Sequence, residues 1–562
     1  MSYQTIYEAW LADPELEEEL RAELLAIAED EEAIKERFYR DLEFGTGGMR
    51  GVMGAGSNRM NRYTIQKATA GFAAYLLSKH HRTAMERGVV IAYDSRRHSR
   101  EFALEAALVL AAYGIRVQIF EKLMPTPVLS FAVRHLHAAG GIVITASHNT
   151  HEYNGYKVYD ENGCQLVPEE AEVLLKEIER FQGPEDIPIL LSQEMVEDDG
   201  LLRWLGGEVL DAFLEAVLSQ SLYADYAAKK ALQVVYTPLH GTGREPVLRA
   251  LAEDGFTSVE LVSAQAEPDG AFTTVRSPNP EERDALALAI ACAEASGADL
   301  VIGTDPDCDR VGIAVKTGDG YRLLSGNQVG ALLLDFVLQQ KRAQLNDRSI
   351  VIKTIVTSDL GAKIAQSYGV KMLETLTGFK FIGQKMTQFQ LSGSQEFLMG
   401  YEESYGYLVG DHARDKDAVV ASMLIAEMAA YYKAQGKTLS DALAGLYQKF
   451  GYYVDEVESF TLEGISGQER IHQIMQALRA ETPETIGGLT VAQYLDYRQG
   501  VDELPPADVL KYGFAEGGWM AVRPSGTEPK IKFYYSLPGC DEAQARARVE
   551  ALKTFAASVV GQ

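Results

Sequence analysis

Three segments of the chain repeat one pattern of hydrophobic and polar positions. Each begins with a short β-branched apolar run, passes through a polar loop into a helix of 3.6-residue periodicity and, after a glycine, ends in a second apolar run. This order predicts βαβ units, in which helices cover a mainly parallel sheet. Because the copies start more than 100 residues apart, they indicate three related α/β domains instead of a short-period solenoid. The segments are 88–120, 231–262 and 349–381, and the glycines that follow their helices are Gly114, Gly255 and Gly369.

The last part of the chain follows a different pattern. Near-alternating residues in the segments EVESFTLEG and WMAVRPSGTEPKIKFYYSL predict an antiparallel sheet in an α+β module. Gly206-Gly207 and Gly326-Asn327 are turn signals that support two domain boundaries, and a third boundary is placed near residue 452. At the other end, ELEEEL and EDEEAIKER predict an acidic, solvated helix. We therefore expect four domains, at 1–205, 206–325, 326–451 and 452–562.

Composition narrows the class of protein. The chain is 46% hydrophobic and 24% charged, which is typical of globular proteins. No apolar run approaches the roughly 18–20 residues that span a bilayer, and the N-terminus lacks the pattern of a signal peptide, so we expect no membrane partner and a cytoplasmic location. A disulfide framework or a zinc site is not supported, since the cysteines are far apart and form no C-x-x-C pair. They are Cys164, Cys292, Cys308 and Cys540.

The net charge bears on the partner. A formal charge of -27 argues against nucleic acid, because phosphate-backbone binding needs a basic face. It does not exclude a small anionic substrate, since a cleft can gather a few Arg and Lys side chains within an acidic protein, and a bound divalent cation adds local positive charge.

The segment GGIVITASHNTHEYNGYKVY carries the most informative polar cluster. The apolar run Ile142-Val143-Ile144 ends at a turn that presents Ser147 beside His148 and Asn149, with Lys157 shortly after. A serine at the carboxyl end of a strand is placed to exchange a group with a ligand. It is not the G-x-S-x-G elbow of esterases, because both flanking glycines are missing. Taken alone, the segment fits an Asn/Ser-rich turn with an N-cap serine equally well.

The segment DLVIGTDPDCDRVGIAV has an alternation of carboxylates after an apolar strand. Asp305, Asp307 and Asp309 can turn toward one point in an extended loop, where an oxygen-only ligand set suits Mg2+. An EF-hand is excluded, because its sixth and twelfth positions hold Arg310 and Lys316 instead of Gly and Glu. Arg310 fits a site that handles a phosphoryl group. An aspartyl-phosphate phosphatase and a solvated acidic loop remain alternatives.

Two further segments carry weaker signals. In FLMGYEESYGYLVGDHARDKDAVVA, Glu402 and Ser404 lie on one side of the chain if the backbone is extended, and a carboxylate and a hydroxyl can bind vicinal sugar hydroxyls. A capping box is an equally good interpretation of these two residues. The run 412–417 also fits a solvated helix start. In VRPSGTEPKIKFY, Gly526 and its polar neighbours favour an anion nest, and a hairpin turn is the alternative. Near the N-terminus, Arg50 lies in a glycine-rich turn that matches neither a Walker A loop nor a Rossmann fingerprint.

Taken together, the motifs identify a family. T-A-S-H-N, D-P-D-x-D-R, E-E-S and R-P-S-G-T-E-P occur in this order and at these separations in the α-D-phosphohexomutase superfamily, and the chain resembles its phosphoglucomutases of the longer bacterial type over essentially its whole length. The resemblance implies three related α/β domains and a C-terminal α+β domain of the TATA-box-binding-protein-like fold, around a central cleft.

The resemblance also implies roles for residues. Ser147 is then the phosphoserine that donates and regains the phosphoryl group, and it holds Mg2+ together with Asp305, Asp307 and Asp309. Further matched positions lie near the reacting phosphoryl group or bind the sugar and the distal phosphate. Near the phosphoryl group they are Arg50, His148, Lys157 and Arg310; the substrate-binding ones are Gly378, Lys380, Glu402, Ser404, Lys416, Arg523, Ser525, Gly526 and Thr527.

The activity implied is the reversible interconversion of glucose 1-phosphate and glucose 6-phosphate, with glucose 1,6-bisphosphate as a reorienting intermediate and activator. Lys157, His148 and a nearby arginine remain alternatives for the general acid/base. The E-E-S form resembles glucose-handling mutases more than the E-M-S-G-H form of bifunctional enzymes, and Gly406 and Tyr407 leave no histidine there. Phosphomannomutase, phosphopentomutase and metal-dependent sugar phosphatase activities stay open, and the sequence predicts no oligomeric state.

Overall fold

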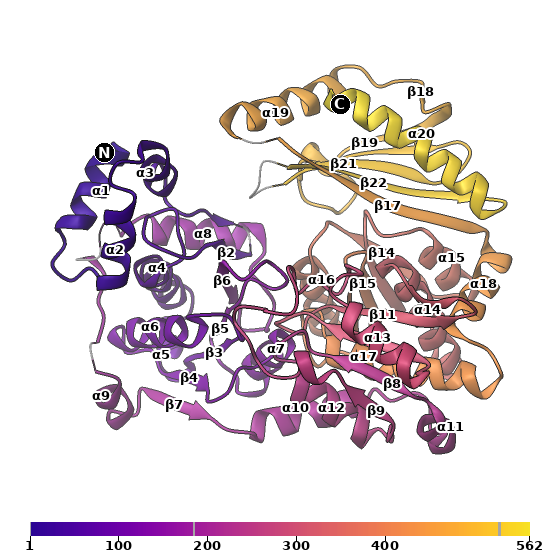
Figure 1. The fold of residues 1–562 in the computed structure, drawn as a ribbon, viewed down its shortest axis with the longest axis horizontal. Helices are drawn as coiled ribbons and strands as arrows, with labels where there is room; N and C mark the ends of the chain where they lie inside the picture. Colours follow the sequence, from indigo (N-terminus) through magenta and orange to yellow (C-terminus); the bar gives the residue numbers. More distant parts are fainter. Residues whose placement is uncertain are drawn as a thin grey trace.

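The computed structural model describes residues 2–45, 47–181, 183, 186–190, 192–462, 464–525 and 530–561, with the side chains of 464–466 left aside. The strands of these residues form four sheets, which we number I to IV along the chain. Figure 1 shows sheet I with its helices at the left, sheets II and III toward the right, and sheet IV above them with the C-terminal helices on its outer side. The predicted fold class is confirmed, because mixed α/β sheets are followed by an antiparallel one.

Sheet I belongs to the first part of the chain. β3 pairs in parallel with β4 and β5, while β6 runs antiparallel to β5. β3 and β5 are buried along their whole length, as expected of central strands covered on both faces. The strand order is β1 (Phe44–Gly45), β2 (Gly48–Val52), β6 (Tyr153–Tyr159), β5 (Gly140–Ile144), β3 (Val89–Tyr93), β4 (Val117–Phe120), β7 (Leu202–Leu205). Its helices are α4 (Arg62–His80), α5 (Arg82–Arg87), α6 (Ser99–Ala112), α7 (Thr126–His135), α8 (Pro168–Ile178) and α9 (Gln193–Asp198).

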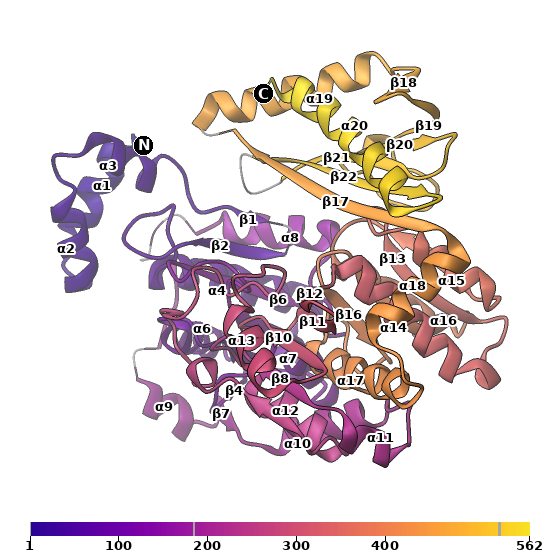
Figure 2. The same cartoon turned by 45° about the vertical axis from the view of Figure 1, so that its right-hand side comes forward.

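The N-terminal extension differs from the single acidic helix that the sequence predicted. The chain forms α1 (Tyr3–Ala12), α2 (Glu18–Ala26) and α3 (Glu31–Phe38), which project from the rest of the molecule in Figure 2. Buried Leu24 and Phe38 belong to a small apolar core, which also includes Ala55 and packs against Tyr63 on α4. The acidic runs therefore cover one side of a helical unit whose other side is packed, and Asp30, near the start of the second run, is the N-cap of α3.

Sheets II and III repeat the predicted strand–helix–strand order. The glycines after the first helix of each repeat have positive φ, at 73° for Gly114, 104° for Gly255 and 72° for Gly369, as helix C-caps require. Sheet II has the order β12 (Gly320–Leu323), β11 (Val311–Thr317), β10 (Leu300–Thr304), β8 (Val234–Thr237), β9 (Val259–Leu261), with α10 (Glu208–Leu218), α11 (Tyr226–Ala231), α12 (Arg244–Glu253), η2 (Ser263–Gln265) and α13 (Ala287–Ser296). Sheet III has the order β14 (Lys371–Thr375), β13 (Ser349–Thr354), β15 (Glu396–Glu402), β16 (Gly406–Val409), with α14 (Gly326–Gln340), η3 (Arg342–Gln344), α15 (Leu360–Ser367), α16 (Phe379–Ser392), α17 (Ala418–Ala434) and α18 (Leu439–Phe450).

One apolar core joins these sheets. α17 is buried along most of its length and packs against α12 and α11 of the second sheet's layer. The same core includes Leu129 on α7, Val247 on α12 and Leu424 on α17. The elements around sheets II and III therefore form one packed body with a part of sheet I, which sets the reactive loops of different sheets in fixed positions.

A buried ion cluster ties α11 to α17. The Nζ of Lys229 lies 2.7 Å from Asp254 Oδ1 and 2.7 Å from Glu427 Oε1, and all three side chains are at most 5% exposed. Burial and the neighbouring Glu427 together raise the pKa of Asp254 to about 6. Two carboxylates at this depth need a cation between them, because charges removed from water must be compensated.

Replacing Lys229 by methionine should destabilise the protein by about 3–5 kcal/mol, because it leaves two buried carboxylates without a cation. Thermal and denaturant unfolding measure the effect. The neighbouring Lys230 is exposed, so Lys230→Met serves as the control and should shift the midpoint little. Equal midpoints for the two variants would contradict the role given to Lys229.

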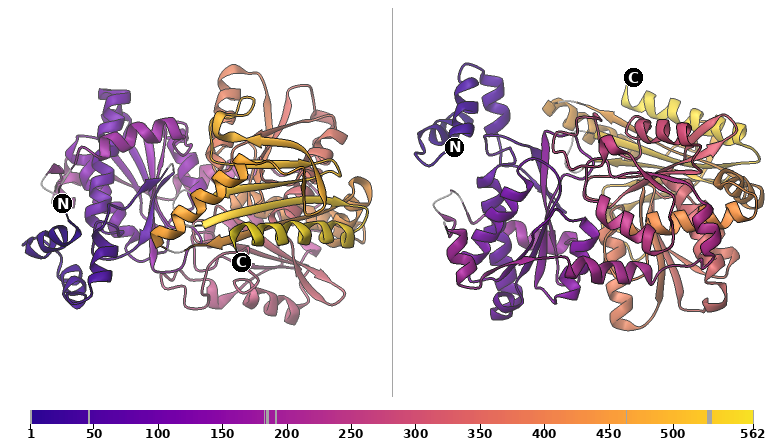
Figure 3. Two further views of the ribbon diagram at one scale, coloured as in Figure 1. Left: turned by 90° about the horizontal axis from the view of Figure 1, so that it is seen from above. Right: turned by 60° about the horizontal axis from the view of Figure 1, so that its bottom comes forward.

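Sheet IV is antiparallel and carries its helices on one face. α20 packs on β22 and β17, and α19 packs on β22, so both cover the outer face, as Figure 3 also shows. The strand order is β17 (Tyr452–Thr461), β22 (Lys530–Gly539), β21 (Trp519–Pro524), β20 (Leu510–Phe514), β19 (Leu489–Asp496), β18 (Thr485–Ile486), with α19 (Gly464–Ala480), η4 (Tyr497–Gln499) and α20 (Glu542–Val560). Among the helices of the described residues, none combines the length and apolar character that crossing a membrane requires.

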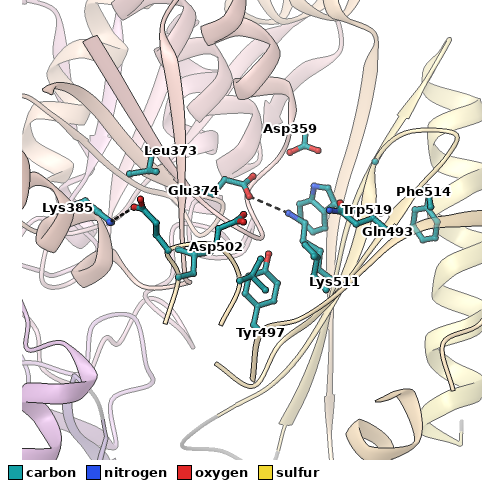
Figure 4. Close-up of a pocket in the computed structure, with 17 residues that line it drawn as sticks. Asp359, Leu373, Glu374, Lys385, Gln493, Tyr497, Asp502, Lys511, Phe514 and Trp519 are labelled. Carbon is teal, nitrogen blue, oxygen red and sulfur yellow. Dashed lines mark ion pairs between the residues drawn. The ribbon is translucent and has the colours of Figure 1, made fainter. Parts of the chain in front are cut away.

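Sheet IV meets the edge of sheet III across a cavity of about 820 Å³. Figure 4 shows Lys511 and Trp519 from sheet IV facing Glu374 on the edge strand β14. Lys511 Nζ donates to the carbonyl of Ile355 at 2.7 Å and lies 4.5 Å from the centre of the Trp519 ring. Burial, with a further contribution from Lys353, lowers the pKa of Lys511 to about 8. The C-terminal module is thus joined to sheet III by a buried lysine as well as by apolar contacts.

Candidate active site

Ser147 lies where the sequence predicted, in the turn that follows strand β5. It is 3% exposed and adopts a positive φ of 52°, which a non-glycine residue rarely takes. Its backbone N–H donates to Thr145 Oγ1 at 2.8 Å, and its Oγ donates to Asp305 Oδ2 at 2.7 Å. The pairing of β5 with β6 sets Lys157 opposite Val143. The turn therefore brings the hydroxyl to the carboxylates of sheet II with a lysine alongside.

The carboxylates come from the hairpin between β10 and β11. One oxygen from each of Asp305, Asp307 and Asp309 lies within 4.8 Å of the others, and all three side chains are buried. The N–H groups of Asp309 and Arg310 donate to Asp305 Oδ1 at 3.1 and 3.0 Å, so the loop is closed on itself.

Two oxygens of the triad accept no hydrogen bond from the described residues. They are the Oδ1 atoms of Asp307 and Asp309, and both are buried. Buried carboxylate oxygens are otherwise almost always paired. Clustered, oxygen-only and negatively charged, this set fits a hard divalent cation such as Mg2+.

Two lysines neutralise the triad. Lys157 Nζ lies 2.7 Å from Asp307 Oδ2 and 3.4 Å from Asp309 Oδ2, and Lys416 Nζ lies 3.0 Å from Asp309 Oδ2. Burial lowers the pKa of Lys157, but Asp307 and Asp309 offset it and leave the pKa raised. Asp305 has its pKa raised well above its usual value by burial and by the other two aspartates. Positive charge is therefore held at the triad by side chains of sheet I and of the loop before α17.

His148 and two arginines surround the serine. His148 Nδ1 lies 3.3 Å from Ser147 Oγ, and burial together with Arg310 and Arg50 lowers the pKa of His148 well below its usual value. Arg50 on β2 donates to Asn149 Oδ1 at 2.9 Å. Arg310 pairs with Glu281. The imidazole beside the serine is thus kept neutral, with cationic groups around it.

The expected sugar-binding residues lie on sheet III. The N–H of Gly378, where φ is 117°, donates to Glu402 Oε1 at 2.8 Å. Burial raises the pKa of Glu402 to about 7, against the effect of Lys416, and burial lowers the pKa of Lys380 to about 8. The extended backbone considered for Ser404 is not found, because β15 ends at Glu402 and residues 403–405 form a turn to β16.

Glu402 and Glu403 have different environments despite being adjacent. Glu403 Oε2 accepts from Thr354 Oγ1 and Thr357 Oγ1, both at 3.2 Å, whereas Glu402 is bonded to the Gly378 backbone. The run 412–417 is not a solvated helix start. Asp417 caps α17, but it is fully buried and bonded to His412 at 2.7 Å. The polar run is covered because it lies between sheets.

The C-terminal loop follows β21. Arg523 pairs with Lys532 across the β21–β22 ladder, and the N–H of Ser525 donates to the carbonyl of Lys530 at 2.8 Å. Gly526 and Thr527 lie outside the described residues. Burial lowers the pKa of Lys532, and Arg523 and then Arg310 lower it further, so the charges of the loop and of sheet II act in a common region.

The sequence motifs did not indicate several residues of this site. Thr126 donates to Asp307 Oδ2 at 2.9 Å, and Asp415 accepts from Lys416 Nζ at 3.1 Å. Arg96 contacts the backbone of the serine turn. The polar loop after β3 was a usable signal for Arg96, because ligands bind at the carboxyl ends of parallel strands; Thr126 and Asp415 carried none.

Comparison with known proteins gives consistent matches. Family models match in succession: "Phosphoglucomutase/phosphomannomutase, alpha/beta/alpha domain I" at residues 41–183, domain II at 211–318, domain III at 325–450 and the C-terminal domain at 471–554. The chain is 40% identical over 512 residues to a protein named phosphoglucomutase from Staphylococcus haemolyticus, covering 89% of this chain and 91% of that one. It is 40% identical over 531 residues to the phosphoglucomutase of Staphylococcus aureus strain MRSA252, covering 92% and 93%.

Solved structures share the fold. A putative phosphomannomutase from Thermus thermophilus superposes with a TM-score of 0.68 at 22% identity, covering 92% of this chain and 99% of that one. The open form of the Paramecium phosphoglucomutase parafusin gives a TM-score of 0.70 at 17% identity, covering 93% and 95%.

Proposed function

The chain belongs to the phosphoglucomutase/phosphomannomutase family of the α-D-phosphohexomutase superfamily, and we propose that it interconverts α-D-glucose 1-phosphate and glucose 6-phosphate through a phosphorylated Ser147. One observation carries the proposal. Ser147 Oγ is bonded to Asp305 within a buried carboxylate triad, two of whose oxygens accept from none of the residues that the structure describes. A hydroxyl at a cation site, with lysines beside it, is the arrangement that phosphoryl transfer to and from serine needs.

The triad fits Mg2+, and Asp305, Asp307 and Asp309 would hold it together with a phosphate oxygen on Ser147. When bound, the ion neutralises phosphoryl oxygens and so lowers the energy of a transition state that spreads negative charge over them.

The residues of the chain supply the rest of the chemistry. In the first half-reaction a sugar hydroxyl attacks the phosphorus of phospho-Ser147; the new P–O bond forms and the bond to Ser147 Oγ breaks. The hydroxyl proton passes to a base, and the departing Ser147 Oγ takes up one proton, so that the serine is again a hydroxyl. Lys157 and Arg310 add positive charge near the transferring group. The bisphosphate then reorients, and its other phosphate returns to Ser147 in the reverse of the same step.

The candidates for the base follow from geometry and from the directions of the pKa shifts. His148 Nδ1 lies 3.3 Å from Ser147 Oγ, and burial with Arg310 and Arg50 lowers the pKa of His148, whereas Asp307 and Asp309 raise the pKa of Lys157. Cation binding at the triad weakens that effect on Lys157, so both residues are tested together. The acid limb of the pH–rate profile that comes from the base, separate from the one that Glu402 contributes, should disappear in His148→Asn if His148 is the base, and in Lys157→Met if Lys157 is.

Substrate binding is assigned to sheets III and IV. We assign Glu402 and Ser404 to sugar hydroxyls, with Gly378, Lys380 and Lys416 around them. Arg523 and Ser525 at the described end of the C-terminal loop are assigned to the phosphate that is not reacting. We assign glucose phosphates as the preferred substrates because the relatives that are 40% identical are named phosphoglucomutase.

The test compares initial rates on glucose, mannose, glucosamine and ribose 1-phosphates, with Mg2+ and catalytic glucose 1,6-bisphosphate. Isomerised sugar phosphate and free phosphate are measured in the same reactions. Fastest isomerisation of glucose 1-phosphate supports the proposal. Release of inorganic phosphate without isomerisation would identify a phosphatase instead, and faster turnover of mannose or ribose 1-phosphate would reassign the substrate.

Arg523→Ala should reduce kcat/KM about ten- to a hundredfold for both glucose 1-phosphate and glucose 6-phosphate. A guanidinium contact to a phosphate contributes about 1.5–3 kcal/mol, and the loop is proposed to hold the distal phosphate in either substrate orientation. Half-reaction rates by rapid quench are the stricter measurement, because the overall equilibrium constant ties the two steady-state directions together. Arg498→Ala, an exposed arginine of the same module, is the control. If only one half-reaction were slower, the C-terminal loop would not bind the distal phosphate in both substrate orientations.

The pH dependence of kcat/KM should contain an acid limb from Glu402. Its pKa is raised to about 7, mainly by burial, so the carboxylate gains a proton as the pH falls through about 7 and becomes a weaker acceptor for sugar hydroxyls. Glu402→Gln should lower kcat/KM above pH 7 and remove this limb. Glu403→Gln is the matched control and should keep it, since Glu403 is bonded to Thr354 and Thr357. The limb from ionisation of the substrate phosphate is common to both variants.

A further inference from the structure

The guanidinium of Arg96 donates hydrogen bonds to several backbone carbonyls of the serine turn. Its Nη1 donates to the carbonyls of Thr150 and Tyr153, and its Nη2 donates to those of Ser147 and Asn149, at 2.5–2.9 Å. The side chain is fully buried. The carbonyl of Thr150 also accepts from the N–H of Tyr153 at 3.2 Å, but without Arg96 the turn would lose a charged donor to each of the four carbonyls, at a considerable cost in free energy. The arginine fork matches this divergent set of acceptors, and a lysine ammonium does not.

The position of Arg96 is itself fixed within sheet I. Asp94 Oδ2 lies 3.2 Å from Arg96 Nε, and Asp94 Oδ1 accepts from the N–H of Arg96 at 2.9 Å and from Ser99 Oγ at 2.8 Å. The N–H of Asp94 donates to the carbonyl of Ile144 at 3.1 Å. The pair therefore lies at the carboxyl ends of the neighbouring strands β3 and β5, directly beneath the turn that carries Ser147.

A loop of sheet II covers the other side of the guanidinium. The ring of Phe272 lies 4.9 Å from Arg96 Cζ, and Phe272 has a positive φ of 48°. A side chain at Gly270 would lie 2.7 Å from Arg97 N and 2.9 Å from Ser95 O, so only glycine fits there. The loop thus docks closely on the backbone around Arg96.

Residues 240–242 connect the same loop to the hairpin that carries the aspartates. His240 bonds to Thr274 Oγ1 at 2.8 Å and to the carbonyl of Glu267 at 3.0 Å. Two residues later, Thr242 donates from its N–H and from its Oγ1 to the carbonyl of Pro306, at 2.8 and 2.9 Å. Pro306 lies between Asp305 and Asp307. A continuous set of contacts therefore runs from the aspartate hairpin through Phe272 to Arg96 and the serine turn.

We propose that Arg96 is a positioning residue: it holds the Ser147 turn in its strained conformation and, through Phe272, in register with the aspartates of sheet II. The inference rests on the proposed function for its kinetic consequence, but not for its structural one. Displacing the serine by about 1 Å from in-line geometry costs about a hundredfold in rate, whereas the groups that bind the sugar and the distal phosphate stay where they are.

The test uses Arg96→Lys, which keeps a cation beside Asp94 and so protects the fold, but lacks the fork. We expect kcat to fall about a hundredfold while KM for glucose 1-phosphate stays within about threefold. Hydrogen–deuterium exchange of a peptide covering residues 145–153 should speed up in the variant, with the core peptides of sheet III unchanged. Phe272→Leu should show the same pattern to a smaller degree.

Arg87→Lys is the matched control, because Arg87 also binds backbone carbonyls, those of His137 and Ala138, but away from the serine turn. It should leave kcat and exchange at 145–153 as in the wild type. A folded Arg96→Lys protein with kcat within threefold of wild type, or with unchanged exchange at 145–153, would overturn the proposal. If the wild-type protein itself failed to isomerise sugar phosphates, the proposed function would fall, and the exchange measurement alone would decide the role of Arg96.

Discussion

Ser147→Ala should abolish mutase turnover, with kcat reduced at least about ten-thousandfold, because no other described hydroxyl occupies its place as phosphoryl carrier. The fold should survive. Alanine must take the same positive φ, and the buried Asp305 Oδ2 loses one donor, which costs about 1–3 kcal/mol. Steady-state rates in both directions, together with a melting curve, measure the two effects separately.

The matched control is Ser277→Ala, which removes a hydroxyl that contacts the carbonyl of His148 at 3.4 Å without reaching the aspartates. It should retain most of its activity. Incubation with glucose 1,6-bisphosphate should phosphorylate the wild-type protein once, on residue 147, and should not phosphorylate Ser147→Ala. Mass spectrometry measures this difference. Turnover of Ser147→Ala within tenfold of wild type would remove the serine from the mechanism.

The hydrophobic pattern predicted the scaffold because it depends on local periodicity. Each repeat's strand, helix and closing glycine could be read from residues close in sequence, and the glycine caps follow from the φ that only glycine adopts at no cost. The same reasoning placed Ser147 after β5 and the aspartates after β10, since polar residues that interrupt a buried strand mark its end.

What the pattern could not predict depends on how the sheets pack together. The 2.7 Å contact between Ser147 and Asp305 joins residues 158 positions apart, and no periodicity encodes it. The run at 412–417 looks solvated in sequence, but the packing of sheets covers it, and His412 and Asp417 satisfy each other. The loop after β3 could point to Arg96 by its position, but the sequence does not show that carbonyls of a turn about 50 residues away surround its guanidinium. The family resemblance supplied the grouping of the motifs, but not these supporting contacts.

Asp307→Asn should lower kcat about a thousandfold at an Mg2+ concentration that saturates the wild type, because a catalytic cation contributes several kcal/mol of transition-state stabilisation. In the structure Asp307 Oδ2 is bonded to Thr126 and Lys157, while Oδ1 is buried without a partner among the described residues, and so it is the oxygen available to the ion. Asparagine keeps the shape and removes the charge. Calorimetric titration with Mg2+ should show weaker binding in the variant.

Loss of the ion or of the Asp307 carboxylate should affect the stability of the protein much less than its activity. The three carboxylates lie on one hairpin, so chelating the ion in the wild-type protein should stop turnover yet barely move the melting temperature. In Asp307→Asn the lost ion pair with Lys157 is offset by weaker repulsion of Asp305 and Asp309, so the midpoint should stay within a few degrees of wild type. The control is Asp319→Asn, an exposed carboxylate in the turn at the other end of β11, which should change neither property. If Asp307→Asn turned over at the wild-type rate in the presence of a chelator, the triad would not be the metal site. Its buried carboxylates would then be balanced by Lys157 and Lys416 alone. The charge on the transferring phosphate would have to be neutralised by arginine and lysine side chains.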